Sequence, residues 1–164
     1  MNIYVGIDPG KSGAIAWLTD DIDDGLQSEN TKKLSARAIN DIFTIFYETA
    51  NKENVHVCLE RVWSFPRDGN KSAFSFGMNY GMWQTLLELH YLPWVSVLPR
   101  TWQGHYEIPK MSKKDRKLLC KTKASDYLSK YKESYKATYS NSDAILLAIY
   151  SKETTSSPSL TQDS

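Results

Sequence analysis

Three carboxylates, Asp8, Glu60 and Asp143, stand where elements of secondary structure are expected to end or begin. Asp8 ends an apolar run that starts at residue 2, Glu60 follows the apolar run 55–59, and Asp143 lies near the start of a last helical segment. A buried charge at a strand end is costly unless it is compensated, and neighbouring carboxylates raise each other's pKa. A divalent cation removes this cost, and oxygen ligands suit Mg²⁺ or Mn²⁺. The three residues are therefore candidate metal ligands.

Other interpretations of these positions stay open on spacing alone. Glu60 could form a salt bridge with Arg61 or a lysine, and Asp143 could simply cap a helix. The turn after the first apolar run is not a phosphate-binding P-loop. Only three residues separate Gly6 from Gly10-Lys11-Ser12, whereas that motif needs four.

The composition is that of a globular domain with an uneven charge. The chain has 164 residues, enough to bury a core, and its net charge is +1, yet residues 61–136 hold 14 Lys and Arg against 6 Asp and Glu. This basic region could bind a polyanion, although a solvated lysine-rich helix face would have the same composition. Cys58 and Cys120 lack the spacing of a zinc site. With no long apolar run and no signal peptide, we expect a cytoplasmic protein with reduced thiols and no membrane contact.

The apolar periodicity predicts one α/β domain over residues 1–152, and the Ser/Thr-rich tail 153–164 is predicted to be disordered. Glycines and a proline between the first two strands predict a hairpin. Ser35 and Ser112 are candidate helix N-caps. Strands are predicted at 2–8, 14–18, 55–59 and 93–98, with a short one after the acidic turn 20–24, and helices at 35–50, 72–90, 112–130 and from 141 or 142 to 149.

Five motifs, in order and with similar spacings from about residue 3 to 150, resemble those of RuvC-type Holliday-junction resolvases. The resemblance implies an RNase H-like fold, in which a mixed central sheet is flanked by helices. It rests on Ile7-Asp8-Pro9-Gly10 after the first strand, Leu59-Glu60-Arg61-Val62-Trp63, Ser72-Ala73-Phe74 with Gly77 and Gly81, Pro99-Arg100-Thr101-Trp102, and Ser142-Asp143-Ala144-Ile145-Leu146.

The resemblance also implies a metal-dependent DNA endonuclease. Asp8, Glu60 and Asp143 would be its catalytic residues and would hold two Mg²⁺ ions, for which Mn²⁺ can substitute. A metal-activated water would attack the phosphate while the second ion stabilises the leaving 3′ oxygen. A homodimer would match the approximate two-fold symmetry of a four-way junction and resolve it by paired nicks. The family further suggests a bacterial or phage-infected cell as the source.

The sequence departs from the family pattern at two positions. The family usually has a fourth acidic or histidine ligand one helical turn before the last aspartate, where this chain has Ser140. A serine binds metal weakly, so we expect a looser second ion and lowered or manganese-dependent activity. The family's lysine after the fifth strand is replaced by Gln103, for which Arg100 or Lys110 could compensate.

The predicted DNA contacts combine one aromatic residue with a basic helix. In the family, the aromatic residue at the place of Trp63 wedges into the junction centre, although core packing is the alternative. Positions 110, 113, 114, 117 and 121 recur at helical spacing and are predicted to present one basic face to phosphates. The DNA-binding candidates are Trp63, Lys71, Arg100, Lys110, Lys113, Lys114 and Lys117.

The helix predicted at 72–90 is apolar on more than one face. It is expected to pack on the sheet and either to form a dimer interface, as in the family, or to be buried entirely. The sequence therefore favours a homodimeric junction-resolving endonuclease. Two alternatives are a branched-DNA-binding protein with weak or no cleavage, which Ser140 would favour, and an RNase H-like nuclease that acts on RNA or replication forks.

Overall fold

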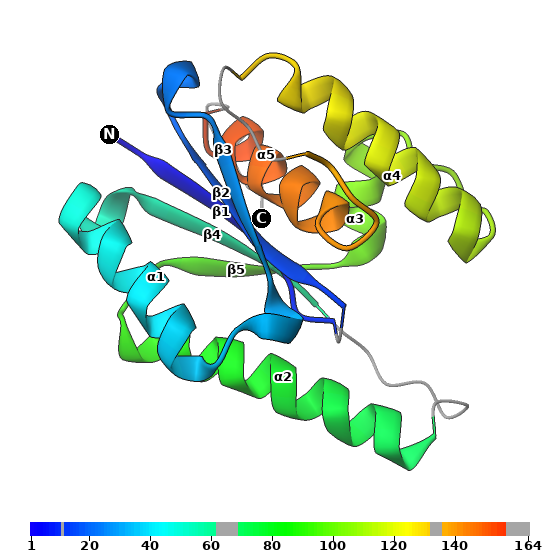
Figure 1. The fold of residues 1–164 in the computed structure, drawn as a ribbon, viewed down its shortest axis with the longest axis horizontal. Helices are drawn as coiled ribbons and strands as arrows, with labels where there is room; N and C mark the ends of the chain where they lie inside the picture. Colours follow the sequence, from blue (N-terminus) through cyan, green and yellow to red (C-terminus); the bar gives the residue numbers. More distant parts are fainter. Residues whose placement is uncertain (11, 62–68, 132–135, 157–164) are drawn as a thin grey trace, which may run out of the picture.

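Five strands form one mixed sheet, with an antiparallel half and a parallel half (Figure 1). The computed structural model describes residues 1–10, 12–61, 69–131 and 136–156. The order across the sheet is β3 (Leu26–Asn30), β2 (Ala14–Thr19), β1 (Ile3–Asp8), β4 (Val55–Glu60) and β5 (Trp94–Val97). The pairs β1–β2 and β2–β3 are antiparallel, whereas β1–β4 and β4–β5 are parallel. The predicted mixed sheet and the predicted hairpin between the first two strands are confirmed.

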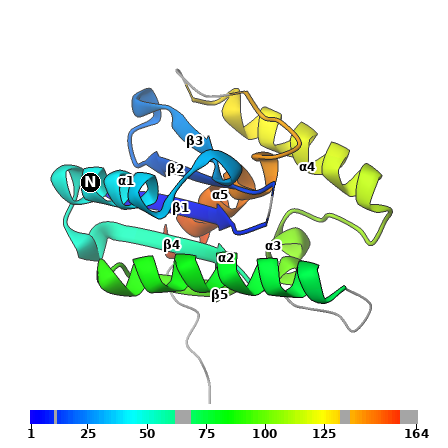
Figure 2. The same ribbon diagram turned by 60° about the horizontal axis from the view of Figure 1, so that its bottom comes forward.

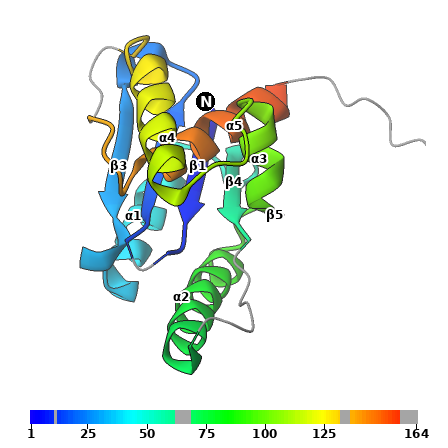
Figure 3. The ribbon, with the colours of Figure 1, turned by 90° about the vertical axis from the view of Figure 1, so that its right-hand side faces the viewer.

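Helices cover both faces of this sheet (Figures 2 and 3). Two of them, α1 (Ala36–Thr49) and α2 (Asn70–Leu89), lie on one face. The other face carries α3 (Pro99–His105), α4 (Lys113–Leu128) and α5 (Ser142–Ser156). Three short 3₁₀ turns connect the elements, η1 (Ile22–Asp24), η2 (Thr31–Lys33) and η3 (Lys52–Asn54).

The central strand β1 is buried on both faces, and its side chains alternate between two cores. Ile3, Val5 and Ile7 pack with α1 and α2, where Phe43 and Trp83 are fully buried. The side of β1 that carries Tyr4 faces α3, α4 and α5. Because β1 is held from both sides, its last residue is fixed in position.

Helix α5 packs directly across β1 at Gly6. A Cβ atom at this glycine would collide with the Ala144 carbonyl oxygen and the Ala148 amide nitrogen of α5. Glycine is therefore required here, because only a residue without a side chain allows the helix so close to the strand. The helix is buried continuously over residues 142–149. Although α5 is apolar, neither it nor any other helix in the described part of the chain is long and apolar enough to cross a membrane.

Most predicted helix boundaries agree with the structure, but α3 was not among the predicted helices and the last helix is longer than predicted. The hydroxyls of Ser35 and Ser112 accept hydrogen bonds from the backbone amides of Ala38 and Asp115, so both predicted N-caps are confirmed. Pro99, which follows the predicted strand 93–98, begins α3, in agreement with the preference of proline for the first helical turn. The last helix continues to Ser156 rather than ending at 149, and residues 157–164 lie outside the described part.

Candidate active site

The three candidate carboxylates come together at one edge of the sheet. Strands β1 and β4 are parallel neighbours that pair Ile7 with Leu59, so Asp8 and Glu60 leave the sheet side by side. Asp143 enters from the first turn of α5. All three line a cavity of about 480 Å³. The sequence therefore brings residues from three distant segments to a single site.

The loop after β1 orients Asp8. The Gly10 amide donates a hydrogen bond to Asp8 Oδ1 at 3.0 Å, and the Gly13 amide donates to the Gly10 carbonyl at 2.9 Å. A Cβ atom at Gly13 would collide with the Asp8 carbonyl, so the close return of the loop requires glycine. Burial raises the pKa of Asp8, and the nearby Asp143 raises it further, whereas Lys117 and the Gly10 amide lower it.

A buried indole fixes Glu60. Trp102 on α3 is fully buried, and its Nε1–H donates a hydrogen bond to Glu60 Oε1 at 3.0 Å. Burial, together with Asp8 and Asp143, raises the pKa of Glu60 to about 8, although the Trp102 hydrogen bond and Lys117 act in the opposite direction. Near neutral pH, this carboxyl therefore holds its proton more strongly than an ordinary glutamate does.

Two consecutive cations on α4 compensate Asp143. Lys117 Nζ lies 2.7 Å from Asp143 Oδ2, and Arg116 NH1 lies 3.2 Å from the same oxygen. The other oxygen, Asp143 Oδ1, is buried, and the described residues include no hydrogen-bond partner for it. A buried carboxylate oxygen without a partner is unusual and calls for an explanation by function.

The donor set fits a hard divalent cation. The three carboxylates face one cavity, Asp8 and Asp143 raise the pKa of Glu60, and Asp143 Oδ1 remains free to accept a ligand bond. In the arrangement described, with Arg116 and Lys117 on Asp143, no group of three or more His, Cys, Asp or Glu among the described residues is close enough together to hold a metal ion.

Comparison with solved structures identifies the fold. Neither the protein-family models nor the curated proteins give a significant match. T. thermophilus RuvC in complex with Holliday junction substrate superposes with a TM-score of 0.50 at 14% identity, covering 91% of this chain and 91% of that chain. A Thermus thermophilus RuvC structure gives 0.50 at 15% identity, over 90% of this chain and 91% of that one. The chain shares its fold with RuvC. The predicted RNase H-like class is thereby confirmed.

Four of the five motifs that resemble RuvC map to element ends in this fold, and the third, with Gly77 and Gly81, lies within α2. The first two close β1 and β4, where Asp8 and Glu60 stand. The fourth forms the first turn of α3, which contributes Trp102, and the fifth opens α5 at Ser142 and Asp143. Segments that are far apart in the chain thus meet at the carboxyl ends of the parallel strands, where α/β sheets commonly place their sites.

The basic residues divide between the cavity and the outer surface. Lys113 and Lys117 line the cavity, whereas Arg100, Lys110 and Lys114 are exposed and lie outside its lining. Trp63 and the side chain of Lys71 lie outside the described residues, so their predicted DNA contacts stay predictions.

The prediction of one basic face over positions 110, 113, 114, 117 and 121 is wrong. Helix α4 begins only at Lys113, so Lys110 precedes it. Lys117 turns inward to Asp143, and the Lys121 ammonium lies 4.9 Å from the centre of the Tyr139 ring. The pairing of buried charges, rather than helical spacing alone, decides where these cations point.

The two departures from the RuvC pattern have different outcomes. Gln103 lines the cavity, and neither Arg100 nor Lys110 takes the place of the missing lysine there. Arg116 and Lys117 on α4 bring positive charge instead. Ser140 is not part of the lining, because its hydroxyl lies 3.1 Å from the Thr138 hydroxyl in the turn before α5.

Sequence reasoning did not predict the roles of three residues in the site, although Arg116 stood in the basic run considered for phosphate binding and Trp102 in the fourth motif. Arg116 contacts Asp143, Trp102 holds Glu60, and Phe76 lines the cavity from α2. One signal for Arg116 was available, because it follows Lys113 by three residues and so shares its helix face. The partnership of Trp102 with Glu60 has no local signal, since it depends on the packing of α3 beneath the end of β4.

Proposed function

We propose that this protein is a metal-dependent endonuclease that resolves four-way DNA junctions by paired nicks. The observation that carries the proposal is the shared cavity of Asp8, Glu60 and Asp143 at the carboxyl ends of β1 and β4 in a RuvC fold. The superposed T. thermophilus RuvC is itself a complex with Holliday junction substrate, which supports branched DNA as the substrate class.

The described residues divide the chemistry between them. Asp8, Glu60 and Asp143 would hold Mg²⁺, or Mn²⁺ in its place, through hard oxygen ligands. Two such ions, when bound, supply an activated water and stabilise charge on the leaving oxygen. Lys113 lines the same cavity, and its ammonium would bind the phosphate next to the carboxylates. Trp102 keeps Glu60 oriented toward the cavity.

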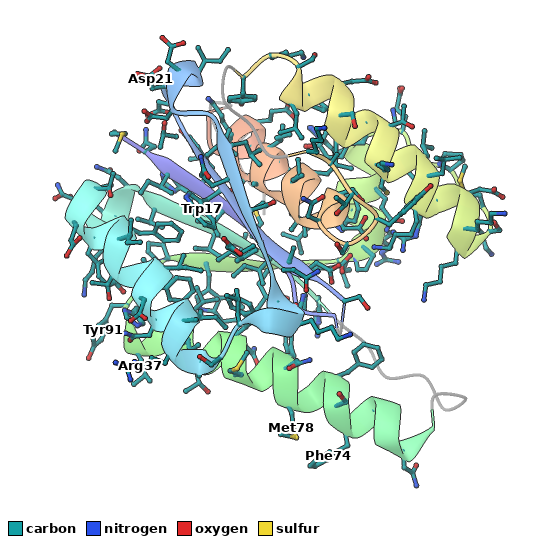
Figure 4. The ribbon with its side chains drawn as sticks, in the orientation of Figure 1. Trp17, Asp21, Arg37, Phe74, Met78 and Tyr91 are labelled. Carbon is teal, nitrogen blue, oxygen red and sulfur yellow. The ribbon has the colours of Figure 1, made fainter. Side chains whose placement is uncertain are left out.

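Helix α2 supports the proposal of a homodimer. Phe74 and Met78 are 70% and 62% exposed, and both point away from the sheet (Figure 4). A Cβ atom at Gly77 or Gly81, on the same side of the helix, would meet nothing within 4 Å. The helix is therefore not buried entirely, and an apolar stripe of this kind suits a two-fold contact with a second copy. Two active sites would then face the two symmetric strands of a junction.

Cleavage of a synthetic four-way junction tests the catalytic proposal. The substrate is compared with a linear duplex of matched sequence, in Mg²⁺ and in Mn²⁺ separately, for the wild type and Asp8→Asn. We expect symmetric nicks in the junction only, reduced by at least about 100-fold in Asp8→Asn. Asp126→Asn, which neutralises an exposed carboxylate on α4, is the matched control and should cleave like the wild type. Equal cleavage of junction and duplex would refute the junction selectivity.

Light scattering and sedimentation test the dimer. Met78→Asp places a charge in the α2 stripe, and we expect it to shift a dimer toward a monomer. Ile45→Asp changes an equally exposed apolar residue on α1 and should leave the mass unchanged. A monomeric wild type at micromolar concentration would contradict the proposed interface.

A second candidate is a junction-binding protein with little or no cleavage. Two observations favour it: Ser140 lies outside the cavity, and Asp143 is already paired with two cations. Tight junction binding without nicks in either metal would select this candidate. Binding that does not distinguish the junction from duplex would exclude both functions and leave the fold alone.

A further inference from the structure

A single carboxylate oxygen in the site binds two cations from neighbouring residues. Lys117 Nζ and Arg116 NH1 both contact Asp143 Oδ2, at 2.7 and 3.2 Å. The Asp143 side chain is only 4% exposed, whereas those of Lys117 and Arg116 are 22% and 23% exposed. The aspartate is thus fixed and buried, while its partners reach it from the more open side of the cavity.

The influence of Lys117 extends beyond this contact. It also lowers the pKa of Asp8 and of Glu60, which burial and the neighbouring carboxylates raise. The cavity therefore holds three carboxylates and three cations, the third being Lys113. Arg116 and Lys117 thus already compensate the one carboxylate that they contact, Asp143. A divalent cation in the same place would repel them and compete for the same oxygen atoms.

We propose that Arg116 and Lys117 act as a built-in counter-ion which a divalent cation must displace from Asp143, so that they weaken metal binding to the protein without DNA. The inference rests on the proposed metal-dependent function. Removing one of the cations leaves the negative charge of Asp143 less balanced, so the carboxylate should bind a metal ion more favourably. Lys117 is the better choice for the test, because its contact with Asp143 is the shorter one.

Calorimetric titration of Mn²⁺ into the metal-free protein, without DNA, tests this inference. We expect Lys117→Met to bind Mn²⁺ on the order of tenfold more tightly than the wild type, and Lys117→Arg, which keeps the charge, to stay within about twofold. Lys114→Met removes the same charge from an exposed neighbour outside the cavity and should also stay within about twofold. Equal or weaker Mn²⁺ binding by Lys117→Met would overturn the inference.

Thermal unfolding gives a second readout that is independent of cleavage. Without metal, Lys117→Met should unfold at a lower temperature than the wild type. Saturating Mn²⁺ should raise the unfolding temperature of Lys117→Met by more than it raises that of the wild type. If Lys117→Met does not fold, Arg116→Gln replaces it with the same expectations, because it acts on the same oxygen. If the variant and the wild type bind Mn²⁺ equally and the wild type cleaves the junction, the counter-ion role is refuted but the proposed function is not. No Mn²⁺ binding by any variant would refute both.

Discussion

Replacing Glu60 by Gln is expected to stabilise the metal-free protein at high pH, although it removes a proposed catalytic group. Glutamine has nearly the same shape, and its amide oxygen can still accept the hydrogen bond from Trp102 Nε1. The rise of the Glu60 pKa from 4.5 to about 8 corresponds to about 5 kcal/mol, at about 1.4 kcal/mol per pKa unit. Because Glu60 is partly exposed, water screens part of this effect, and we expect about 2–4 kcal/mol.

The sign of the pH dependence follows from the direction of this pKa shift. Between pH 4.5 and about 8, the folded protein keeps the Glu60 proton that the unfolded chain has lost. The free energy of unfolding therefore falls as the pH rises through this window. Asp8, whose pKa burial also raises, adds to the same trend. Glu60→Gln removes the contribution of Glu60, so its advantage should be near zero at pH 4.5 and full above pH 8.

Urea unfolding at pH 4.5 and pH 8.5, in a chelating buffer, measures this difference. Glu29→Gln changes an exposed glutamate on β3 and serves as the matched control, with an expected effect below about 0.5 kcal/mol at either pH. Saturating Mg²⁺ should abolish the advantage of Glu60→Gln, because a bound cation compensates the charge. If Glu60→Gln were less stable than the wild type at pH 8.5, the ionised Glu60 carboxylate would not destabilise the metal-free fold, and the reasoning would be wrong.

Three further predictions concern two supports of the site, Trp102 and Gly6, and one candidate DNA contact, Lys114. Trp102→Phe removes the N–H donor to Glu60 and leaves a small void, so thermal unfolding should report a loss of about 2–4 kcal/mol. Gly6→Ala forces a Cβ atom into the α5 backbone, and urea unfolding should show a free energy of unfolding lower by at least about 3 kcal/mol. Gly104→Ala is the control, because its added atom meets nothing within 4 Å, and it should be neutral or slightly stabilising. Lys114→Ala should weaken junction binding by the same factor for every DNA sequence, because a phosphate contact does not read bases. Binding measured over a range of salt concentrations should show a slope of log affinity against log salt that is smaller by about 0.9.

Simple patterns predicted the strands and helices that carry the carboxylates, whereas the RNase H-like fold and the shared site were implied by the resemblance to RuvC-type resolvases. Apolar runs that end in Asp8 and Glu60 predict buried strands, and the carboxyl ends of parallel strands must share an edge. Ser35 and Ser112 mark two helix starts by capping chemistry that is local to the sequence. Such features need no knowledge of which segments pack together.

The partners of the carboxylates could not be predicted in the same way. Periodicity gave α4 a row of lysines, but it could not tell that Lys117 turns inward while Lys114 stays exposed. That choice depends on Asp143, which lies 26 residues from Lys117 in the sequence. The contacts of Arg116 with Asp143 and of Trp102 with Glu60 were not predicted for the same reason, because long-range pairing has no signature in a single sequence.

The charges of the cavity explain why this site would suit catalysis rather than stability. Burial raises the pKa of Asp8 and Glu60, so their ionised forms are unfavourable in the metal-free protein. Asp143 is paired with two cations through one oxygen, and its other oxygen has no hydrogen-bond partner among the described residues. The fold maintains this arrangement because Gly6 admits α5 against β1 and because Trp102 holds Glu60. A ligand that satisfies all three carboxylates at once would regain the free energy spent on bringing them together. The substitutions that most stabilise the metal-free protein should therefore be the ones that abolish metal binding.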